Sequence, residues 1–344
     1  MKKHIYTISF SFVLAAFTLY VVLDTFVISH PMEYVQEQIN TSMFSSRQSS
    51  SKEDNLTNYS DIGSSDSGTD TEYSGSSQSS CSENVSSEEQ NGISSNSVST
   101  DGAKLIGEYQ NDQAAIKLYE YNYESTAVYV ADIVVSSSEY IKTAFASNCY
   151  GKNVTDKTSS IAQQNDAILA INGDYYGARE NGYVIRNGVV FRDSSDGRDL
   201  LCICADGTMK IVNSDDQSAQ ELVDSGVWQA FSFGPALVQN GQVDVSVNEE
   251  VGRAMASNPR TAVGMIDTCH YVFVVSDGRT SDSKGLSLYQ LATFMQNIGV
   301  KTAYNLDGGG SSTLYFNGEL INYPTTSGRS MKERGVSDIV YIAK

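Results

Sequence analysis

Four Asn-Gly or Asp-Gly dipeptides, each next to short apolar runs, constrain the fold of this chain more than any other feature. They lie at 187–188, 206–207, 240–241 and 317–318. A two-residue type I′ turn needs positive φ at both central positions, and these dipeptides adopt that conformation readily. They predict strand pairs at 183–185 and 189–191, 201–205 and 209–212, and 314–316 and 320–321, with a further strand at 236–238 before the remaining turn.

The rest of the domain follows the same pattern with a few helices. Runs rich in β-branched and aromatic residues predict two more hairpins, 115–123 with 126–135 and 260–266 with 271–276, and apolar runs predict strands at 167–171 and 301–306. Leu288, Leu291, Met295 and Ile298 recur on one helical face, between an N-cap at Ser287 and a stop at Gly299. Shorter helices are expected at 156–165 and 218–224. The predicted class is α+β: a single mixed domain of mainly antiparallel hairpins with a few helices, over residues 103–344.

The first third of the chain differs from this domain. A basic start and a long apolar run over 5–28 predict an uncleaved signal anchor, a transmembrane segment over residues 1–30. Lys2 and Lys3 would stay in the cytoplasm and place the domain outside the cell membrane. Residues 31–102 are expected to be a disordered, Ser-rich stalk, because the stretch 45–100 holds very few large apolar side chains.

Composition excludes several classes of function. The formal net charge of −18 argues against nucleic acid as a partner, and an anionic ligand would need a local cluster of arginines. The chain has three histidines, of which two lie in the N-terminal segment, so a Ser-His-Asp triad would rest on His270 alone, and we do not expect one. The five cysteines form no CxxC motif and are expected to be buried thiols, with one disulfide as the alternative.

The stretch Asn305-Leu306-Asp307-Gly308-Gly309-Gly310-Ser311-Ser312 is the strongest candidate for a binding site. Three adjacent glycines lose much conformational entropy on folding and bury nothing. They suit a loop whose backbone approaches another group closely, or whose N–H groups point into one anion-binding concavity. With a carboxylate before them and two hydroxyls after them, they predict a sugar or phosphate site. A tight turn between two elements is the alternative.

Polar residues follow other predicted strands in the same way. Asn172, Asp174, Tyr175 and Tyr176 combine the aromatic faces and polar groups that carbohydrate pockets use, although an ordinary Asn-Gly turn with two tyrosines has the same residues. The stretch 233–236 predicts a stiff turn that leads into a strand.

A further pair of clusters supplies arginines. Pro259 restricts Asn258 to extended geometry, so Arg260 is held in one direction and suits a phosphate group, with a surface salt bridge as the alternative. Asp277 and Arg279 follow the next apolar run. Several such clusters beside strand ends in one domain predict one shared site.

These motifs resemble those of a known family. INGDYY (171–176), RNGVV (186–190), FGPALV (233–238), NPRTAVG (258–264), SDGR (276–279), NLDGGGSSTLY (305–315) and the stretch 334–338 occur in this order. Over about residues 150–344 the chain resembles the phosphodiester glycosidase family, in particular bacterial members of the exopolysaccharide biosynthesis type. The resemblance implies hydrolysis of a GlcNAc-1-phosphodiester-like bond at the anomeric carbon, on cell-surface or exopolysaccharide glycans.

The residues can be assigned roles in such a reaction. The transition state resembles an oxocarbenium ion, and the departing phosphate needs charge stabilisation more than it needs an acid. We expect Asp307 or Asp174 to act as base or nucleophile. The expected phosphate ligands are Arg260 and Arg279, the N–H groups of Gly308, Gly309 and Gly310, and the hydroxyls of Ser311 and Ser312. Asn172, Asn258 and Asp277 are expected to bind substrate, with Tyr175 or Tyr176 against the sugar ring.

The same residues are compatible with other functions. The scheme requires no cofactor, although Asp174, Asp277 and Asp307 offer oxygen ligands for a divalent cation. A non-catalytic glycan-binding protein of the cell surface and a metal-dependent phosphodiesterase are the alternatives. The joint presence of Asp174, Arg260, Asp277 and Asp307 favours an enzyme. The expected partners are a phosphodiester-linked sugar or cell-wall glycan, and the membrane through the N-terminal helix.

Overall fold

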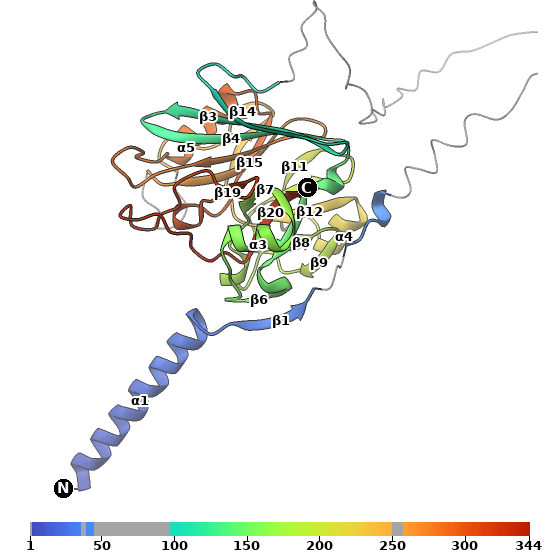
Figure 1. Cartoon of the computed structure of the whole chain (residues 1–344). Coiled ribbons are helices and arrows are strands. Elements are labelled where there is room, and N and C mark those ends of the chain that lie inside the picture. The colour runs from blue at the N-terminus through green and yellow to red at the C-terminus, as the bar shows by residue number, and fades with distance from the viewer. Residues whose placement is uncertain (1, 36–38, 45–96, 250–256) are drawn as a thin grey trace, which may run out of the picture.

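The structure is a computed structural model that describes residues 2–35, 39–44, 97–249 and 257–344. Antiparallel sheets form the body of the domain, and short helices cover their outer faces (Figure 1). The predicted α+β class is confirmed. Each predicted hairpin is present, and the turn residues Asn187, Asn240 and Asn317 have the positive φ that the Asn-Gly pattern requires.

The largest sheet has eight strands. In spatial order they are β14 (Gln242–Val243), β13 (Ala236–Gln239), β17 (Thr302–Asn305), β15 (Arg260–Asp267), β16 (His270–Ser276), β4 (Thr126–Val135), β3 (Ala114–Tyr123) and β2 (Lys104–Gln110). Strands that form a hairpin are neighbours in this sheet. Strand β17 lies between β13 and β15, so the glycine loop, which follows β17, begins at an interior strand of the sheet.

Three smaller sheets complete the domain. One contains β11 (Met209–Asn213), β10 (Asp199–Cys204), β12 (Val227–Phe231), β8 (Val184–Arg186) and β9 (Val189–Arg192). Another contains β19 (Glu319–Leu320), β18 (Leu314–Phe316), β7 (Ala167–Asn172), β20 (Asp338–Ala343) and β5 (Lys142–Phe145). The last pairs β1 (His30–Tyr34) with β6 (Cys149–Lys152).

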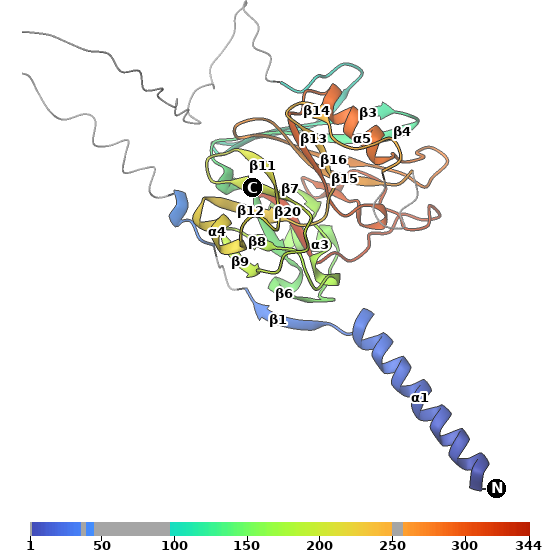
Figure 2. The ribbon, with the colours of Figure 1, turned by 180° about the vertical axis from the view of Figure 1, so that it is seen from behind.

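Helices lie at the predicted positions, with ends that differ from the expected ones by a few residues. Within the described part of the chain the structure has α1 (Lys2–Phe26), α3 (Thr158–Gln164), α4 (Ala219–Asp224) and α5 (Leu288–Asn297), with 3₁₀ turns η1 (Ser138–Tyr140), η2 (Ala146–Asn148), η3 (Tyr176–Ala178) and η4 (Gly309–Ser311). Ser287 and Ser218 cap α5 and α4 through capping boxes. Figure 2 shows α5 against β13 and β14.

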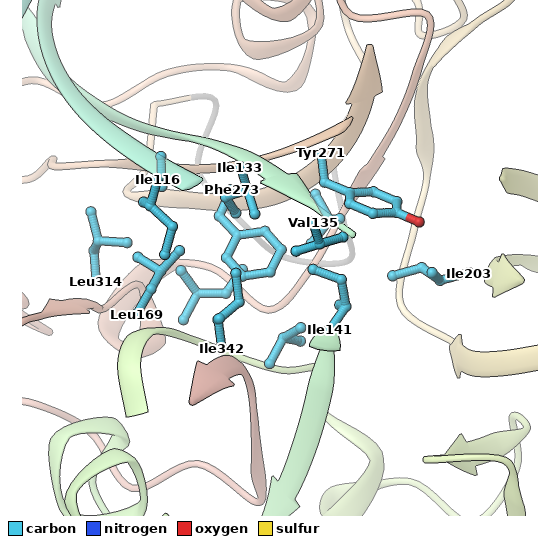
Figure 3. Close-up of a cluster of buried hydrophobic side chains, with 14 of the residues drawn as sticks. Ile116, Ile133, Val135, Ile141, Leu169, Ile203, Tyr271, Phe273, Leu314 and Ile342 are labelled. Carbon is cyan, nitrogen blue, oxygen red and sulfur yellow. The ribbon is translucent and has the colours of Figure 1, made fainter. Parts of the chain in front are cut away.

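The core lies on both faces of the eight-stranded sheet. Successive residues of β16 alternate between two apolar clusters: Tyr271, Phe273 and Val275 face one, and Val272 and Val274 face the other. Figure 3 shows the first cluster, in which side chains of the large sheet meet those of β7, β18 and β20. The second cluster holds the apolar face of α5, as the helical spacing predicts. Burial on both faces explains why β16 is apolar along its length.

Part of the N-terminal segment contacts this domain. Strand β1 pairs with β6, and the Phe44 ring packs edge-on against Trp228 at 5.1 Å. Val98, just before the predicted domain boundary, lies in the core. Most of the predicted stalk, residues 45–96, falls outside the described residues, together with Cys81. The other four cysteines are buried free thiols, as predicted.

The predicted membrane anchor falls on α1, which extends away from the domain in Figure 1. Among the residues that the structure describes, no helix combines the length and the apolar character needed to cross a membrane.

Candidate active site

The ends of strands from two sheets meet at the glycine loop. Strand β17 leads into this loop, and strand β7 leads into the stretch 172–176. Strand β20 begins beside the end of β7, with Ile339 opposite Asn172. The Asn172 side chain joins the two sheets, because its Nδ2 donates to the backbone oxygen of Asp307 at 2.7 Å. The predicted convergence of strand ends on one site is therefore present.

Asn172 acts as a clamp between these loops. Its Nδ2 also donates to the Gly173 carbonyl at 3.1 Å, and its Oδ1 accepts from Thr261 Oγ1 at 2.9 Å and from the Thr313 N–H at 3.2 Å. The side chain is fully buried. Sequence reasoning expects it to hold a sugar hydroxyl, but in the structure its hydrogen-bonding groups are occupied in fixing the backbone of the site.

The three glycines allow close packing around the loop. A Cβ atom would lie 2.9 Å from the Pro259 carbonyl oxygen at Gly308, 3.0 Å from Arg279 Nη2 at Gly309 and 2.5 Å from Thr326 Oγ1 at Gly310. Gly309 also has a φ of +63°, which other residues rarely adopt. The Gly309 N–H donates to Pro259, so this predicted phosphate ligand is already occupied within the fold.

Asp307 and Arg334 form the most accessible polar pair of the site. Arg334 Nη2 lies 2.7 Å from Asp307 Oδ2, and its Nε donates to Ser311 Oγ at 2.8 Å. The Arg334 side chain is 41% exposed and that of Asp307 is 13% exposed. Tyr175 is 45% exposed, and its ring centroid lies 5.9 Å from the Arg334 guanidinium carbon. A carboxylate, a guanidinium and an aromatic face are thus presented together.

The environment of Asp307 makes its carboxylate a stronger base than an exposed aspartate. Burial raises the pKa of Asp307, because the charged form loses hydration. Arg334, the Ser311 hydroxyl and the more distant charge of Arg179 act in the opposite direction and lower it, without cancelling the effect of burial. The result is a carboxylate with a raised pKa that is held in one orientation by Arg334.

Two further arginines surround the pair. Arg279 lies against the glycine loop and donates to Asn258 Oδ1 and to the Thr326 carbonyl, each at 2.8 Å. Burial and the nearby positive charge of Arg334 lower the pKa of Arg279. Arg179 follows η3 and donates to the Ser232 carbonyl at 2.9 Å. Three guanidinium groups and one carboxylate carry a formal charge of +2, which suits an anionic ligand in a protein of net charge −18.

Beneath the site lies a buried charge network. Arg186 Nη2 is 3.0 Å from Asp174 Oδ1, and Arg186 Nε is 2.7 Å from Asp338 Oδ2. The Phe231 ring covers the guanidinium at 4.3 Å. Burial raises the pKa of Asp338, and the Arg186 charge opposes this rise. Two carboxylates share one cation, so the network fixes the end of β8 to the start of β20 and the loop after β7.

The structure separates the predicted site residues into two groups. One group lies at or next to the accessible Asp307–Arg334 pair. It consists of Asp307 itself, the glycines 308–310, Ser311, Tyr175, Asn258 and Arg279. Tyr176, Ser312 and Asp174 are buried beneath, and Arg260 is 3% exposed with its Nε donating to the Leu286 carbonyl at 2.8 Å. Of the two tyrosines, only Tyr175 offers a ring to a ligand, because Tyr176 stacks on Tyr150.

Asp277 contacts the loop that follows β19. Its Oδ1 accepts from the Tyr323 N–H at 2.7 Å and from Asn322 Nδ2 at 3.3 Å. The sequence alone assigns no role to Arg179, Arg186, Arg334 or Asp338. Arg186 lies in the motif RNGVV, and Arg334 and Asp338 lie in the stretch 334–338, so the resemblance to the family is the signal that points to these three positions.

Each aspartate that the sequence offers as an oxygen ligand for a cation has another partner in the structure. Among the described residues, no three His, Cys, Asp or Glu side chains form a group that could hold a metal ion. Asp174 is paired with Arg186, Asp307 with Arg334, and Asp277 with backbone and amide donors.

Known proteins are similar to this chain in sequence. The sequence model of the phosphodiester glycosidase family matches residues 165–343. The SPbeta prophage-derived uncharacterized protein YomE of Bacillus subtilis is 29% identical over 184 residues, which cover 51% of this chain and 28% of that protein. N-acetylglucosamine-1-phosphodiester alpha-N-acetylglucosaminidase of Mus musculus is 30% identical over 109 residues, 30% of this chain and 21% of that protein. The chain thus spans less than a third of the length of these relatives.

Solved structures share the fold. The catalytic domain of the zebrafish N-acetylglucosamine-1-phosphodiester alpha-N-acetylglucosaminidase, auto-inhibited by its pro-peptide, superposes with a TM-score of 0.53 at 21% identity, covering 70% of this chain and 87% of that chain. A hypothetical protein from Synechocystis gives a TM-score of 0.54 at 13% identity, covering 70% of this chain and 63% of that chain. Since the family model covers more than half of the sequence, the chain belongs to the phosphodiester glycosidase family.

Proposed function

We propose that this protein hydrolyses a sugar-1-phosphate diester at the anomeric carbon, with Asp307 as the catalytic carboxylate. The observation that carries the proposal is the Asp307–Arg334 pair at the mouth of the glycine loop, with Arg279 and Arg179 beside it. The mouse relative is named for an N-acetylglucosamine-1-phosphodiester, which makes a diester of this class the first substrate to test.

Arg334 and Arg279 would hold the phosphate. A guanidinium binds two phosphate oxygens at once, and two such groups close together repel each other until an anion lies between them. Arg279 lies against Gly309 and Arg334 contacts Ser311, so both guanidinium groups reach the same short loop. As the C–O bond breaks, negative charge grows on the departing phosphate monoester. Fixed cations at that point stabilise the transition state, and one such interaction contributes about 3–4 kcal/mol.

Asp307 would act on the anomeric carbon, either by activating a water molecule or by direct attack. A raised pKa increases its basicity, and Arg334 keeps it ionised. Asp174 does not suit this role, because it is 2% exposed, forms an ion pair with Arg186 and accepts hydrogen bonds from the Tyr176 and Ser232 N–H groups. In this scheme Asp174 positions the loop after β7, which carries Tyr175.

Tyr175 would support the sugar ring. It is half exposed beside Arg334, so a pyranose whose phosphate is bound by the guanidinium would lie with its C–H face against this ring. We further infer that the substrate is a glycan of the cell surface or an exopolysaccharide, which follows from the resemblance to bacterial family members and from the predicted anchor.

Incubation of the full chain with a GlcNAc-1-phosphodiester tests the proposal. We expect release of free GlcNAc by the wild-type protein, in the presence and absence of EDTA, and release about 10²–10⁴-fold slower by Asp307→Asn. Loss of activity in EDTA would favour the metal-dependent phosphodiesterase. Absence of release from a panel of sugar-1-phosphate diesters, together with retained glycan binding, would favour the non-catalytic glycan-binding protein.

A further inference from the structure

A cavity lies beside Asp277, the residue that follows strand β16. Its volume is about 670 Å³, within the range of small-ligand sites. Strands β3 and β4 contribute Glu120, Tyr121 and Tyr129, the loop after β16 contributes Asp277, and the loop after β19 contributes Tyr323. The proposed hydrolysis uses none of the residues that line this cavity.

The chemistry of its walls differs from that of the phosphate site. Three carboxylates line the cavity, those of Glu120, Asp277 and Asp282, against the single ammonium group of Lys104. An anion is therefore disfavoured here. Glu120 and Tyr129 are opposite each other in the β3–β4 pair. Burial raises the pKa of the Tyr129 hydroxyl, and the charges of Asp277 and Glu120 raise it further.

These walls have the composition of a sugar site. Carboxylate oxygens accept hydrogen bonds from hydroxyl groups, and tyrosine faces pack against the C–H faces of a pyranose. Tyr323 is 38% exposed, so its ring is available to a ligand. Its position is fixed by its own backbone N–H, which donates to Asp277 at 2.7 Å.

The Asn322 side chain links the cavity to the glycine loop. Asn322 Nδ2 donates both to Asp277 Oδ1 at 3.3 Å and to the Ser312 carbonyl of the glycine loop at 3.0 Å. Two residues after Asp277, Arg279 lies against Gly309. Hydrogen bonds through Asn322 and the short chain segment from Asp277 to Arg279 thus connect the acidic, tyrosine-lined cavity to the glycine loop of the cationic site.

We propose that this cavity is a subsite for a neutral sugar unit of a glycan substrate, separate from the sugar that is released. The inference rests on the proposed function for its link to catalysis, but binding at the cavity does not require hydrolysis. It predicts that the substrate is an oligosaccharide or polysaccharide chain with a phosphodiester, and that small diesters use only part of the protein's binding surface.

Binding of neutral tetrasaccharides to the full chain carrying Asp307→Asn tests the subsite. Chitotetraose and maltotetraose are titrated by calorimetry. We expect one of them to bind, and Tyr323→Ala to weaken its binding about tenfold, or about 1.4 kcal/mol. Tyr289→Ala removes an equally exposed ring from α5 and should leave binding unchanged. Absence of binding by both sugars, or equal effects of the two variants, would overturn the proposal.

A second pair of variants tests the acidic wall. Glu120→Gln keeps the shape of the side chain and removes its charge, so we expect weaker tetrasaccharide binding, whereas Glu108→Gln on neighbouring strand β2 serves as the control. Equal binding by both variants would contradict the role of Glu120. If the protein binds the tetrasaccharide but hydrolyses no diester, the proposed function fails and the subsite stands. If the protein hydrolyses the diester but binds neither tetrasaccharide, the subsite is overturned and the proposed function stands.

Discussion

Arg334 Nη2 lies 2.7 Å from Asp307 Oδ2 and joins the glycine loop to the segment that enters β20. The pair brings together residues 27 positions apart in the sequence. The same guanidinium contacts Ser311 and lies near Tyr175, so one arginine orients the carboxylate, the loop and the aromatic face. The proposed chemistry depends on this arrangement, and each part of it can be tested separately.

Asp307→Asn should remove activity without unfolding the protein. The amide cannot act as a base or nucleophile, so we expect kcat to fall by about 10²–10⁴-fold. The side chain keeps its size and can still accept from Arg334, so the melting temperature should change by less than about 2–4 °C. Asp112→Asn, in an exposed turn, is the matched control. A large loss of thermal stability in Asp307→Asn would mean that Asp307 is architectural.

Arg334→Met should move the acid limb of the pH profile to higher pH. The Arg334 charge lowers the pKa of Asp307 against the effect of burial, so its removal raises that pKa further. Since the catalytic carboxylate must be ionised, kcat/KM would begin to rise only at a higher pH than in the wild type. Arg329→Met, on an exposed arginine of the same loop, should leave the limb in place. An unshifted limb in Arg334→Met would exclude Asp307 as the titrating group.

Arg279 and Arg260 should respond differently to replacement by lysine. Arg279 lies against the glycine loop, and loss of its planar fork should raise KM for the diester about tenfold, or about 1.4 kcal/mol. Arg260 is buried with its Nε on the Leu286 carbonyl, so Arg260→Lys should lower the melting temperature with little effect on KM. A raised KM in Arg260→Lys at unchanged stability would show that Arg260 binds the phosphate, as its sequence position predicts.

Arg186→Met should destabilise the fold strongly. It leaves Asp174 and Asp338 buried without their shared cation, and breaking a buried ion pair in this way costs about 3–5 kcal/mol of unfolding free energy. Burial already raises the pKa of Asp338. The variant loses the positive charge of Arg186 that opposes this rise, so the pKa of Asp338 rises further. A raised folded-state pKa favours the protonated carboxyl, so the stability of the variant should fall as pH rises through that pKa.

Denaturant unfolding at several pH values measures this effect. Arg198→Met, which removes a half-exposed arginine paired with Asp196, is the control and should change stability by less than about 1 kcal/mol. An Arg186→Met variant as stable as this control would show that the network does not hold the strands together.

The hairpins and helix α5 could be predicted from sequence because their signals are local. The Asn317-Gly318 turn lies between two short strands, and Ser287 and Gln290, three positions apart, form a capping box. In each case the residues that determine the element are within a few positions of each other, so spacing alone identifies them.

The charge network and the choice between neighbouring residues could not be predicted in this way. Arg186 and Asp338 are 152 positions apart and meet only because β8 and β20 are brought together by the sheets. Likewise, the sequence offers Tyr175 and Tyr176 equally, but the turn η3 directs Tyr176 into the core and leaves Tyr175 beside Arg334. Such contacts depend on tertiary packing, which spacing does not record.

The most direct test of the central claim is the position of ¹⁸O after hydrolysis of a GlcNAc-1-phosphodiester by the full chain in H₂¹⁸O. Cleavage at the anomeric carbon, directed by Asp307 with the phosphate on Arg334 and Arg279, places the label on the released sugar. Mass spectrometry of both products at early times distinguishes the two bonds. Label on the phosphate would contradict the account and assign the reaction to a phosphodiesterase.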